Sequence, residues 1–252
     1  MTKTEVAQER SIVNKIVRVE SYEFDERFYQ KILDGERIFQ PSVTHILGCA
    51  YPSSFALMEW RGDVGNKRAD EILEETGNDG SFVHESIQGI LEGNSVDGSL
   101  INTKFSPKRS LKIKRCLKAF LDWHEKYKPV TLKLESIVWS DEYGFAGTLD
   151  LLCEIDKKTY LIDFKTSRAL HDSHKVQVCA YGMAEKADHV ALLHLGNTTK
   201  QRYSFKVLTD EERSEGESAF MMTNALFKVL NPNARPSEET FPEVFALKGG
   251  IK

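Results

Sequence analysis

Two aspartates and a lysine near the middle of the chain have the residue types and spacing of a hydrolytic metal site. Asp150, Asp163 and Lys165 lie in two apolar segments that the dipeptide Asp156-Lys157 separates. If that dipeptide is a two-residue hairpin loop, Asp150 faces Asp163 across the two strands, and Lys165 shares their face because side chains alternate. Two carboxylates directly opposite one another repel, and apolar surroundings make this repulsion costlier. A divalent cation bound between them would remove the conflict.

The cation expected here is Mg²⁺ or Mn²⁺, because both ions favour oxygen ligands and commonly take one or two carboxylates with water and phosphate. Lys165, which the same register places opposite Thr148, would then polarise a water or neutralise charge on a transition state. A second interpretation stays open, in which the sheet edge faces solvent and Asp163 and Lys165 are ordinary surface charges.

The elements that position these residues follow from the apolar periodicity, which changes near Pro129 from helical spacing to alternation. We expect strands over residues 132–139, 145–155, 159–165, 190–195 and 202–207, with helices over 173–186 and 209–230. The order predicts an α/β fold with a central mixed β-sheet flanked by helices.

The residues before Pro129 are predicted to be mostly helical. We expect a hairpin around Asp34-Gly35, then helices over 43–47, from Ser53 or Ser54 to a stop at Gly77, from Asp79 to Leu91, and from Pro107 to Pro129. The last 20 or so residues, with their prolines and the Gly249-Gly250 pair, are expected to form an extended tail.

Composition restricts the class of protein. The chain has 252 residues, 40% of them hydrophobic and 29% charged, with a net charge of −4. This balance excludes a disordered chain, a collagen-like chain and a disulfide scaffold, and the net charge argues against a protein that coats nucleic acid non-specifically. With no apolar run long enough for a membrane span and no signal-peptide pattern at the N-terminus, we expect a cytoplasmic protein.

Five short motifs together resemble the PD-(D/E)xK nuclease superfamily, and specifically its RecB-type branch in phage-like form. The resemblance runs from about Pro41 to Tyr181, and its motifs occur in the order of the family. They are Pro41-Ser42-Val43-Thr44-His45-Ile46-Leu47, Gly80-Ser81-Phe82-Val83-His84, Gly147-Thr148-Leu149-Asp150, Asp163-Phe164-Lys165 and Gln177-Val178-Cys179-Ala180-Tyr181.

The resemblance implies a restriction-endonuclease-like core and a role for each matching residue. Metal ligands would be His84, Asp150, Asp163 and the Phe164 carbonyl; Lys165 would support the attacking water, with Glu135 as an auxiliary acid; Gln177 and Tyr181 would orient the site or touch the nucleic-acid backbone. The chain would be one nuclease domain over 1–252, with an N-terminal helical elaboration over 1–78, a catalytic core over 79–208, and a C-terminal helix and tail over 209–252.

Each of these residues also has a plainer interpretation. His84 fits a partly buried helix histidine, Glu135 a solvated strand residue, and Gln177 with Tyr181 a pair on one helix face at the edge of the core. The cluster His171-Asp172-Ser173-His174 is interpreted as a solvated loop rather than a second metal site.

A basic run precedes the strands and is a candidate for contact with nucleic acid. Lys108, Lys112 and Arg115 fall on one side of the predicted helix, with no acid between Lys104 and Lys118. Phosphate contact is the functional interpretation, and the solvated face of an amphipathic helix is the alternative. Some RecB-type members carry an iron–sulfur cluster, but we expect none here because no cysteine lies beyond Cys179.

The function that these features predict is a Mg²⁺- or Mn²⁺-dependent deoxyribonuclease, with exonuclease action on single-stranded or duplex DNA ends in recombination, repair or replication. Three alternatives remain: a flap or junction endonuclease, a weakly active DNA-binding subunit that needs a recombinase, helicase or single-strand-binding protein, and a metal-binding structural protein.

Overall fold

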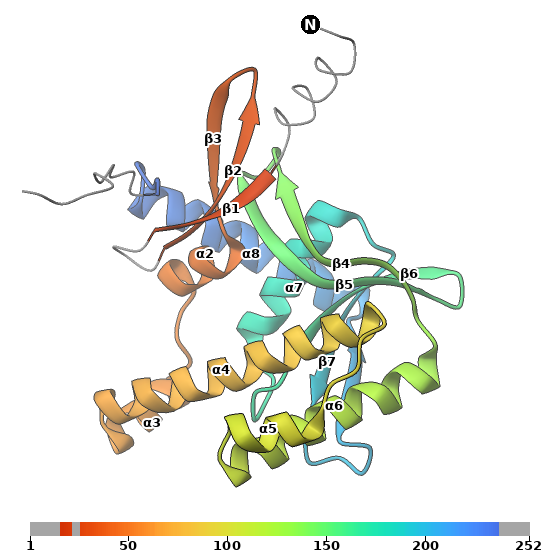
Figure 1. Cartoon of the computed structure of the whole chain (residues 1–252). Coiled ribbons are helices and arrows are strands. Elements are labelled where there is room, and N and C mark those ends of the chain that lie inside the picture. The colour runs from red at the N-terminus through yellow and green to blue at the C-terminus, as the bar shows by residue number, and fades with distance from the viewer. Residues whose placement is uncertain (1–15, 22–25, 237–252) are drawn as a thin grey trace, which may run out of the picture.

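The computed structural model describes residues 16–21 and 26–236 (Figure 1). The expected extended tail lies mostly outside the described residues, as does the start of the chain. Among the described helices, none is long and apolar enough to cross a membrane.

The centre of the molecule is a five-stranded mixed sheet in the order β4-β5-β6-β7-β8. Strands β6 and β7 are parallel and the other neighbours are antiparallel. The strands are β4 (Val130–Ser140), β5 (Phe145–Ile155), β6 (Lys158–Lys165), β7 (His189–Leu195) and β8 (Tyr203–Val207). The predicted α/β fold with a central mixed β-sheet flanked by helices is confirmed.

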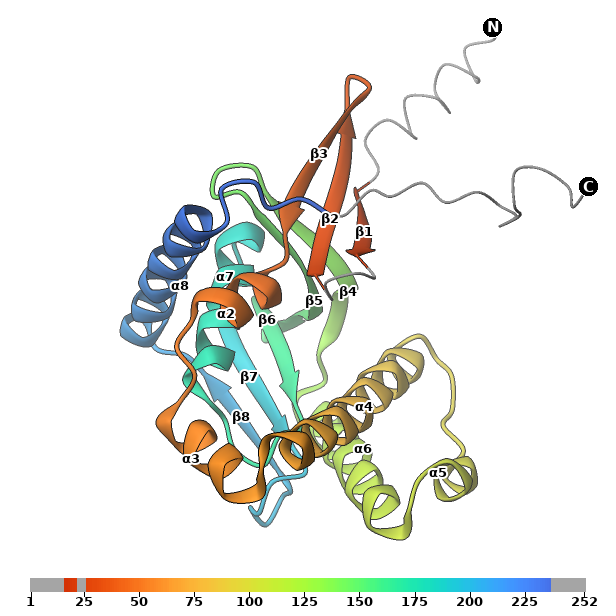
Figure 2. The same ribbon diagram turned by 90° about the vertical axis from the view of Figure 1, so that its left-hand side faces the viewer.

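Helices cover both faces of this sheet (Figure 2). One face packs against α4 (Asn66–Leu91) and α6 (Pro107–Tyr127), with α5 (Gly98–Lys104) packed on α6, and the other against α2 (Val43–Ala50), α7 (Asp172–Glu185) and α8 (Asp210–Leu230). Alternation along each strand divides the core accordingly. On β7, for example, Leu192 belongs to the α2–α7–α8 cluster and Leu193 to the α4–α5–α6 cluster.

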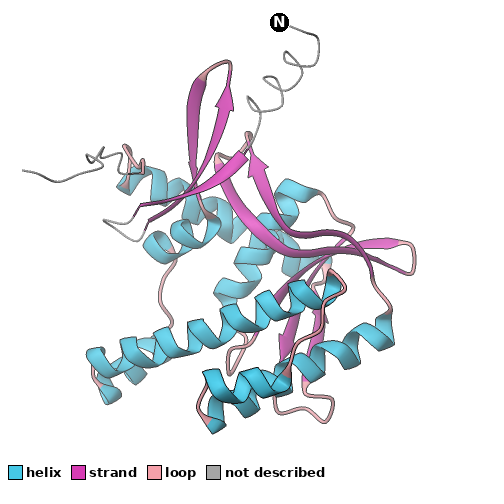
Figure 3. Ribbon diagram, viewed as in Figure 1, coloured by secondary structure: helices cyan, strands magenta, loops and turns pink. Residues whose placement is uncertain are grey.

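The N-terminal elaboration contains a second sheet as well as helices (Figure 3). Strands β1 (Ile16–Ser21), β2 (Glu26–Leu33) and β3 (Glu36–Pro41) are antiparallel in that order. The hairpin predicted around Asp34-Gly35 joins β2 to β3, and both loop residues have positive φ, as a tight hairpin turn requires. The sequence indicated the hairpin but not the third strand.

Side-chain caps fix the helix starts that the sequence predicted. The Ser42 hydroxyl accepts a hydrogen bond from the backbone N–H of His45 at the start of α2. The Ser54 hydroxyl does the same for α3 (Phe55–Val64), and Thr209 forms the expected capping box with Glu212 at the start of α8.

The predicted break between two helices at Gly77 and Asp79 is wrong, because α4 continues through both residues as one helix. The Asp79 side chain does not cap a new helix but is buried, and Arg109 of α6 donates to its Oδ1 at 2.7 Å. The ion pair and the packing of α4 on α6 therefore override the weak helix propensity of glycine and aspartate here.

Candidate functional site

A cavity of about 540 Å³ opens where the core sheet, α4, α7 and the N-terminal sheet meet. It is lined by side chains from all four parts, among them His84, Glu135, Asp150, Lys165 and Gln177. Most of the polar residues that the sequence predicted as a site therefore share one cavity.

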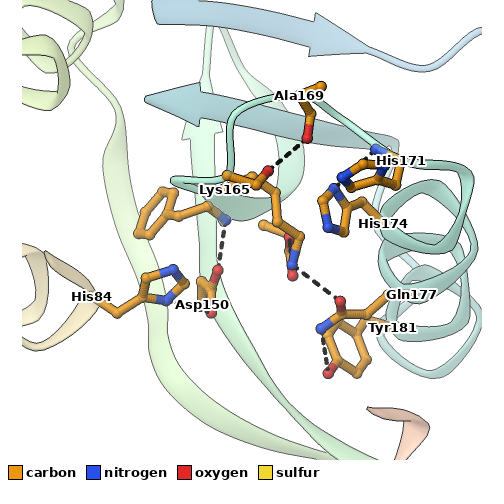
Figure 4. A network of polar contacts seen from close by, with 11 residues as sticks. His84, Asp150, Lys165, Ala169, His171, His174, Gln177 and Tyr181 are labelled. Atoms are coloured by element: carbon orange, nitrogen blue, oxygen red, sulfur yellow. Dashed lines mark hydrogen bonds and ion pairs between the residues drawn. The ribbon is translucent and has the colours of Figure 1, made fainter. Parts of the chain in front are cut away.

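The β5–β6 hairpin has the predicted two-residue loop, and its register holds from Ile155–Lys158 up to Leu151–Ile162. The predicted continuation to Asp150–Asp163 and Thr148–Lys165 is wrong, because the described backbone pairing ends there. Asp150 Oδ2 instead accepts a hydrogen bond of 2.6 Å from the Phe164 N–H (Figure 4). The side chain of Asp150 thus replaces a strand carbonyl, and the two strands separate at the site.

The neighbouring strand β4 is also irregular at this level. Glu135 has a φ of 43°, in the left-handed region that a non-glycine residue rarely occupies. The pairs Leu134–Leu151 and Ser136–Leu149 flank it, so the distortion lies beside Asp150. Backbone strain of this kind costs about 1–3 kcal/mol and is concentrated at functional sites. Here it accompanies the placement of the Glu135 carboxylate in the cavity.

Three side chains form a group that could hold a divalent metal. One donor atom each from His84, Glu135 and Asp150 lie within 4.8 Å of one another. Ligands of an octahedral ion at about 2.1 Å lie at most about 4.2 Å apart, so small side-chain rotations would suffice for binding. One imidazole and two carboxylates form a reasonable set for a first-row divalent ion with open positions for water. The donor set therefore fits the predicted metal.

Charge coupling within this group is strong. Burial disfavours the charged form of His84, but the Asp150 carboxylate, whose Oδ1 lies 3.4 Å from Nδ1, outweighs burial and raises the pKa of His84 to about 9. Burial also opposes ionisation of Asp150, yet His84, Lys165 and the Phe164 N–H hold its pKa below the usual value. Burial and then the Asp150 charge raise the pKa of Glu135 to about 7.

Behind the metal-capable group, Lys165 is held by two partners. Its Nζ lies 2.6 Å from Asp163 Oδ2, in an ion pair that lacks the direction of a hydrogen bond, and donates to Gln177 Oε1 at 3.0 Å. Gln177 Nε2 in turn donates to Tyr181 Oη at 3.2 Å (Figure 4). Burial raises the pKa of Asp163 to about 6 despite the nearby Lys165 charge, and burial raises the pKa of Tyr181.

Close packing fixes the position of Tyr181. A Cβ placed on Gly147 would lie 2.5 Å from Tyr181 Cε1, so only glycine allows the ring this close to β5. The glycine of the predicted Gly147–Asp150 motif therefore has a steric reason, which the sequence alone did not provide.

The predicted site residues fall into three places. His84, Glu135 and Asp150 form the metal-capable group, and Asp163 lies beside Lys165 rather than in that group. Phe164 lines the cavity and contributes its N–H to Asp150. The three basic residues of α6 do not line the cavity: Lys108, Lys112 and Arg115.

The histidines that follow β6 have a local structural role. His171 is the N-cap of α7, and its backbone N–H donates to His174 Nδ1 at 3.2 Å. Burial and then the Lys165 charge lower the pKa of His174 to about 3. The pair forms a capping box at the start of the helix that the sequence predicted, and His171 and Asp172 are exposed there.

The wall contributed by the N-terminal sheet was not predicted. Tyr29 of β2 is buried and its hydroxyl lies 2.8 Å from Thr148 Oγ1 of β5. Arg18 of β1 and the hydroxyl residues Ser42 and Thr44 line the same side of the cavity. Ser42 and Thr44 belong to the Pro41–Leu47 motif, whereas no motif connects Arg18 or Tyr29 to the site, and the Tyr29–Thr148 contact joins positions 119 residues apart.

Comparison with known proteins leaves the site geometry as the main guide to function. No model of a known protein family matches the chain, and no curated protein sequence does. Among solved structures, the chain resembles a protein from Eubacterium rectale provisionally named as an exonuclease, with a TM-score of 0.40, 12% identity, and coverage of 68% of this chain and 76% of that one. It also resembles the protein SSO0001, with a TM-score of 0.29 and 17% identity over 46% of this chain and 61% of that one, less than two thirds of its length.

Proposed function

We propose that this protein is a divalent-metal-dependent nuclease that hydrolyses phosphodiester bonds in DNA and acts as an exonuclease. The observation that carries the proposal is the position of a metal-capable group beside a lysine held in place within one cavity. Exonuclease action and DNA as substrate follow from the motifs that resemble RecB-type nucleases, with Mg²⁺ or Mn²⁺ as the metal.

His84, Glu135 and Asp150 would hold the metal ion. When bound there, a divalent cation acts as a Lewis acid that lowers the pKa of a water and stabilises charge on the phosphoryl oxygens.

The residues of the chain then have separate tasks. Asp163 and Gln177 fix the position of the Lys165 ammonium group. This cation orients the attacking water and neutralises charge on the phosphate. Tyr181 anchors Gln177.

The test compares the wild-type protein with Lys165→Ala and Asp150→Asn on end-labelled linear DNA and on closed circular single-stranded DNA. Wild type is expected to degrade the linear DNA with Mg²⁺ or Mn²⁺, to spare the circles, and to stop in EDTA. Each variant should lose at least about 100-fold in rate, because each removes a group that acts in the transition state.

Lys118→Ala is the matched control, since Lys118 is an exposed lysine of α6 whose side chain pairs with Asp122. Cleavage of the closed circles would show that the protein is an endonuclease and not an exonuclease. If neither substrate is cut with any metal, the chain alone is not a nuclease.

A further inference from the structure

The cavity has a second wall whose residues lie outside every nuclease-like motif. Arg18 and Tyr29 are direct partners across β1 and β2, so their side chains emerge on the same face of the N-terminal sheet. Both residues line the cavity that contains the metal-capable group. The N-terminal sheet is therefore part of the site and not only an appendage to the core.

Contacts along β2 fix which face of the N-terminal sheet meets the core. Tyr29 is 3% exposed and its hydroxyl reaches Thr148, two residues before Asp150. Two positions further on the same face, Lys31 donates to Asp141 at 2.9 Å, in the turn that joins β4 to β5. These two contacts along β2 fix the orientation of this face, and they also fix the position of Arg18, because Arg18 pairs with Tyr29.

The charges that line the cavity show what the second wall can add. The basic side chains in the lining are those of Arg18, His84 and Lys165. His84 lies beside Asp150 and Lys165 beside Asp163, so these two cations belong to the metal end of the cavity. Arg18 is exposed and is contributed by the N-terminal sheet, and a guanidinium matches the geometry of a phosphate with two parallel hydrogen bonds.

We propose that Arg18 binds a phosphate of the substrate strand next to the one that is cleaved, and that the Tyr29–Thr148 contact positions Arg18 for this task. This inference rests on the proposed function and adds to it a substrate-positioning residue contributed by the N-terminal sheet. A single strand of nucleic acid would pass between the two walls, with one phosphate at the metal-capable group and its neighbour at Arg18.

The experiment measures steady-state cleavage and, with Ca²⁺ in place of the catalytic metal, the affinity for a fluorescent single-stranded oligonucleotide. Arg18→Ala should weaken binding and raise KM by about tenfold, while kcat stays within about twofold of wild type. It should also lower the steepness of log affinity against log salt by about 0.7, the value of one phosphate contact on a single strand. Arg18→Lys keeps the charge and should recover part of the affinity, and Tyr29→Phe, which removes the bond to Thr148, should lie between wild type and Arg18→Ala.

Arg37→Ala is the control, because Arg37 is an exposed arginine of β3 in the same sheet and does not line the cavity. Equal affinity and salt slope for Arg18→Ala and Arg37→Ala, while wild type cleaves DNA, would overturn the role of Arg18 and leave the proposed function intact. Wild type that neither binds nor cleaves DNA would overturn both. The melting temperature of each variant, compared with that of wild type, separates a lost contact from a lost fold.

Discussion

His84 of α4 lies 3.4 Å from Asp150 of β5, measured between Nδ1 and Oδ1, and this contact joins a helix on one face of the sheet to the strand that carries the metal-capable group. Phe164 supports both partners: its ring packs edge-on against His84, and its N–H donates to Asp150. The imidazole is therefore fixed where a metal ligand must be, and it competes with a metal for the same carboxylate.

The first prediction concerns which metal the group prefers. Because one of its three donors is an imidazole nitrogen, Mn²⁺ should bind more tightly than Mg²⁺, which strongly favours oxygen. His84→Ala should therefore weaken Mn²⁺ binding by about 10- to 100-fold and Mg²⁺ binding by less. Isothermal titration calorimetry with each ion measures this, with His189→Ala as the control, because His189 does not line the cavity. Equal losses for both ions would show that His84 is not a ligand.

The second prediction is that metal affinity rises with pH. In the metal-free protein, His84 with a pKa of about 9 and Glu135 with a pKa of about 7 are both protonated below neutral pH. A metal requires the neutral imidazole and the ionised carboxylate, so binding releases protons. The affinity should increase by about tenfold per pH unit between pH 7 and 9, and more steeply below pH 7.

Titrations in buffers of different ionisation enthalpy count the released protons directly. His84→Gln should abolish the pH dependence of metal affinity above pH 7. Below pH 7 it should retain the part of that dependence that Glu135 contributes. A wild-type affinity that is constant from pH 6 to 9 would mean that neither group exchanges a proton for the metal.

Most elements of the core could be predicted because their signals are local. Alternation identified the strands, and hydroxyl caps such as Ser42 and Thr209 marked helix starts that the structure confirms. The break expected at Gly77 failed for a tertiary reason, since the stabilising partner of Asp79 is Arg109, 30 residues away. A propensity argument contains no information about such a partner.

The candidate site was predictable to the same extent. The order of the motifs brought His84, Asp150 and Lys165 into consideration, and the structure places all three in one cavity. The predicted strand pairing is wrong at Asp150 because its carboxylate, rather than a backbone carbonyl, accepts the hydrogen bond from Phe164 N–H. Apolar periodicity contains no information about such a side-chain contact. The Tyr29–Thr148 contact spans 119 positions and has no motif at all.

The third prediction separates positioning of Lys165 from metal binding. Gln177→Ala removes the acceptor that directs Lys165 Nζ but leaves its partner Asp163 in place. The value of kcat should fall by about tenfold, the size expected for a misdirected catalytic group, while KM and Mn²⁺ affinity stay near wild type. Gln88→Ala is the control, since Gln88 also lines the cavity but donates to Glu92 instead. Loss of Mn²⁺ affinity in Gln177→Ala would argue for a general disturbance of the site.

The fourth prediction assigns Arg109 to the fold. Asp79 is 5% exposed, and its other cationic neighbour, Lys112, is 3.8 Å away. Arg109→Ala should therefore lower the free energy of unfolding by about 2 kcal/mol, because a buried carboxylate loses its closest donor. Lys108→Ala, on the exposed side of α6, should change it by less than about 0.5 kcal/mol. In chemical denaturation, the double variant Asp79→Ala, Arg109→Ala should lose less free energy of unfolding than the two single variants lose together. Strict additivity of the two losses would contradict the pairing.

The fifth prediction concerns the contact between Gly147 and Tyr181. The added Cβ of Gly147→Ala would lie 2.5 Å from a ring that is 3% exposed and held by Gln177, so the ring cannot simply move into solvent. Such overpacking should cost about 1–3 kcal/mol, and it should reduce kcat because Gln177 and Lys165 shift with the ring. Gly48→Ala provides the opposite case, since its Cβ would meet nothing within 4 Å inside α2 and should stabilise the protein by up to about 1 kcal/mol. In chemical denaturation, the free energy of unfolding should therefore fall for Gly147→Ala and rise for Gly48→Ala, and only Gly147→Ala should reduce cleavage. Stabilisation by both substitutions would show that Tyr181 has room to move.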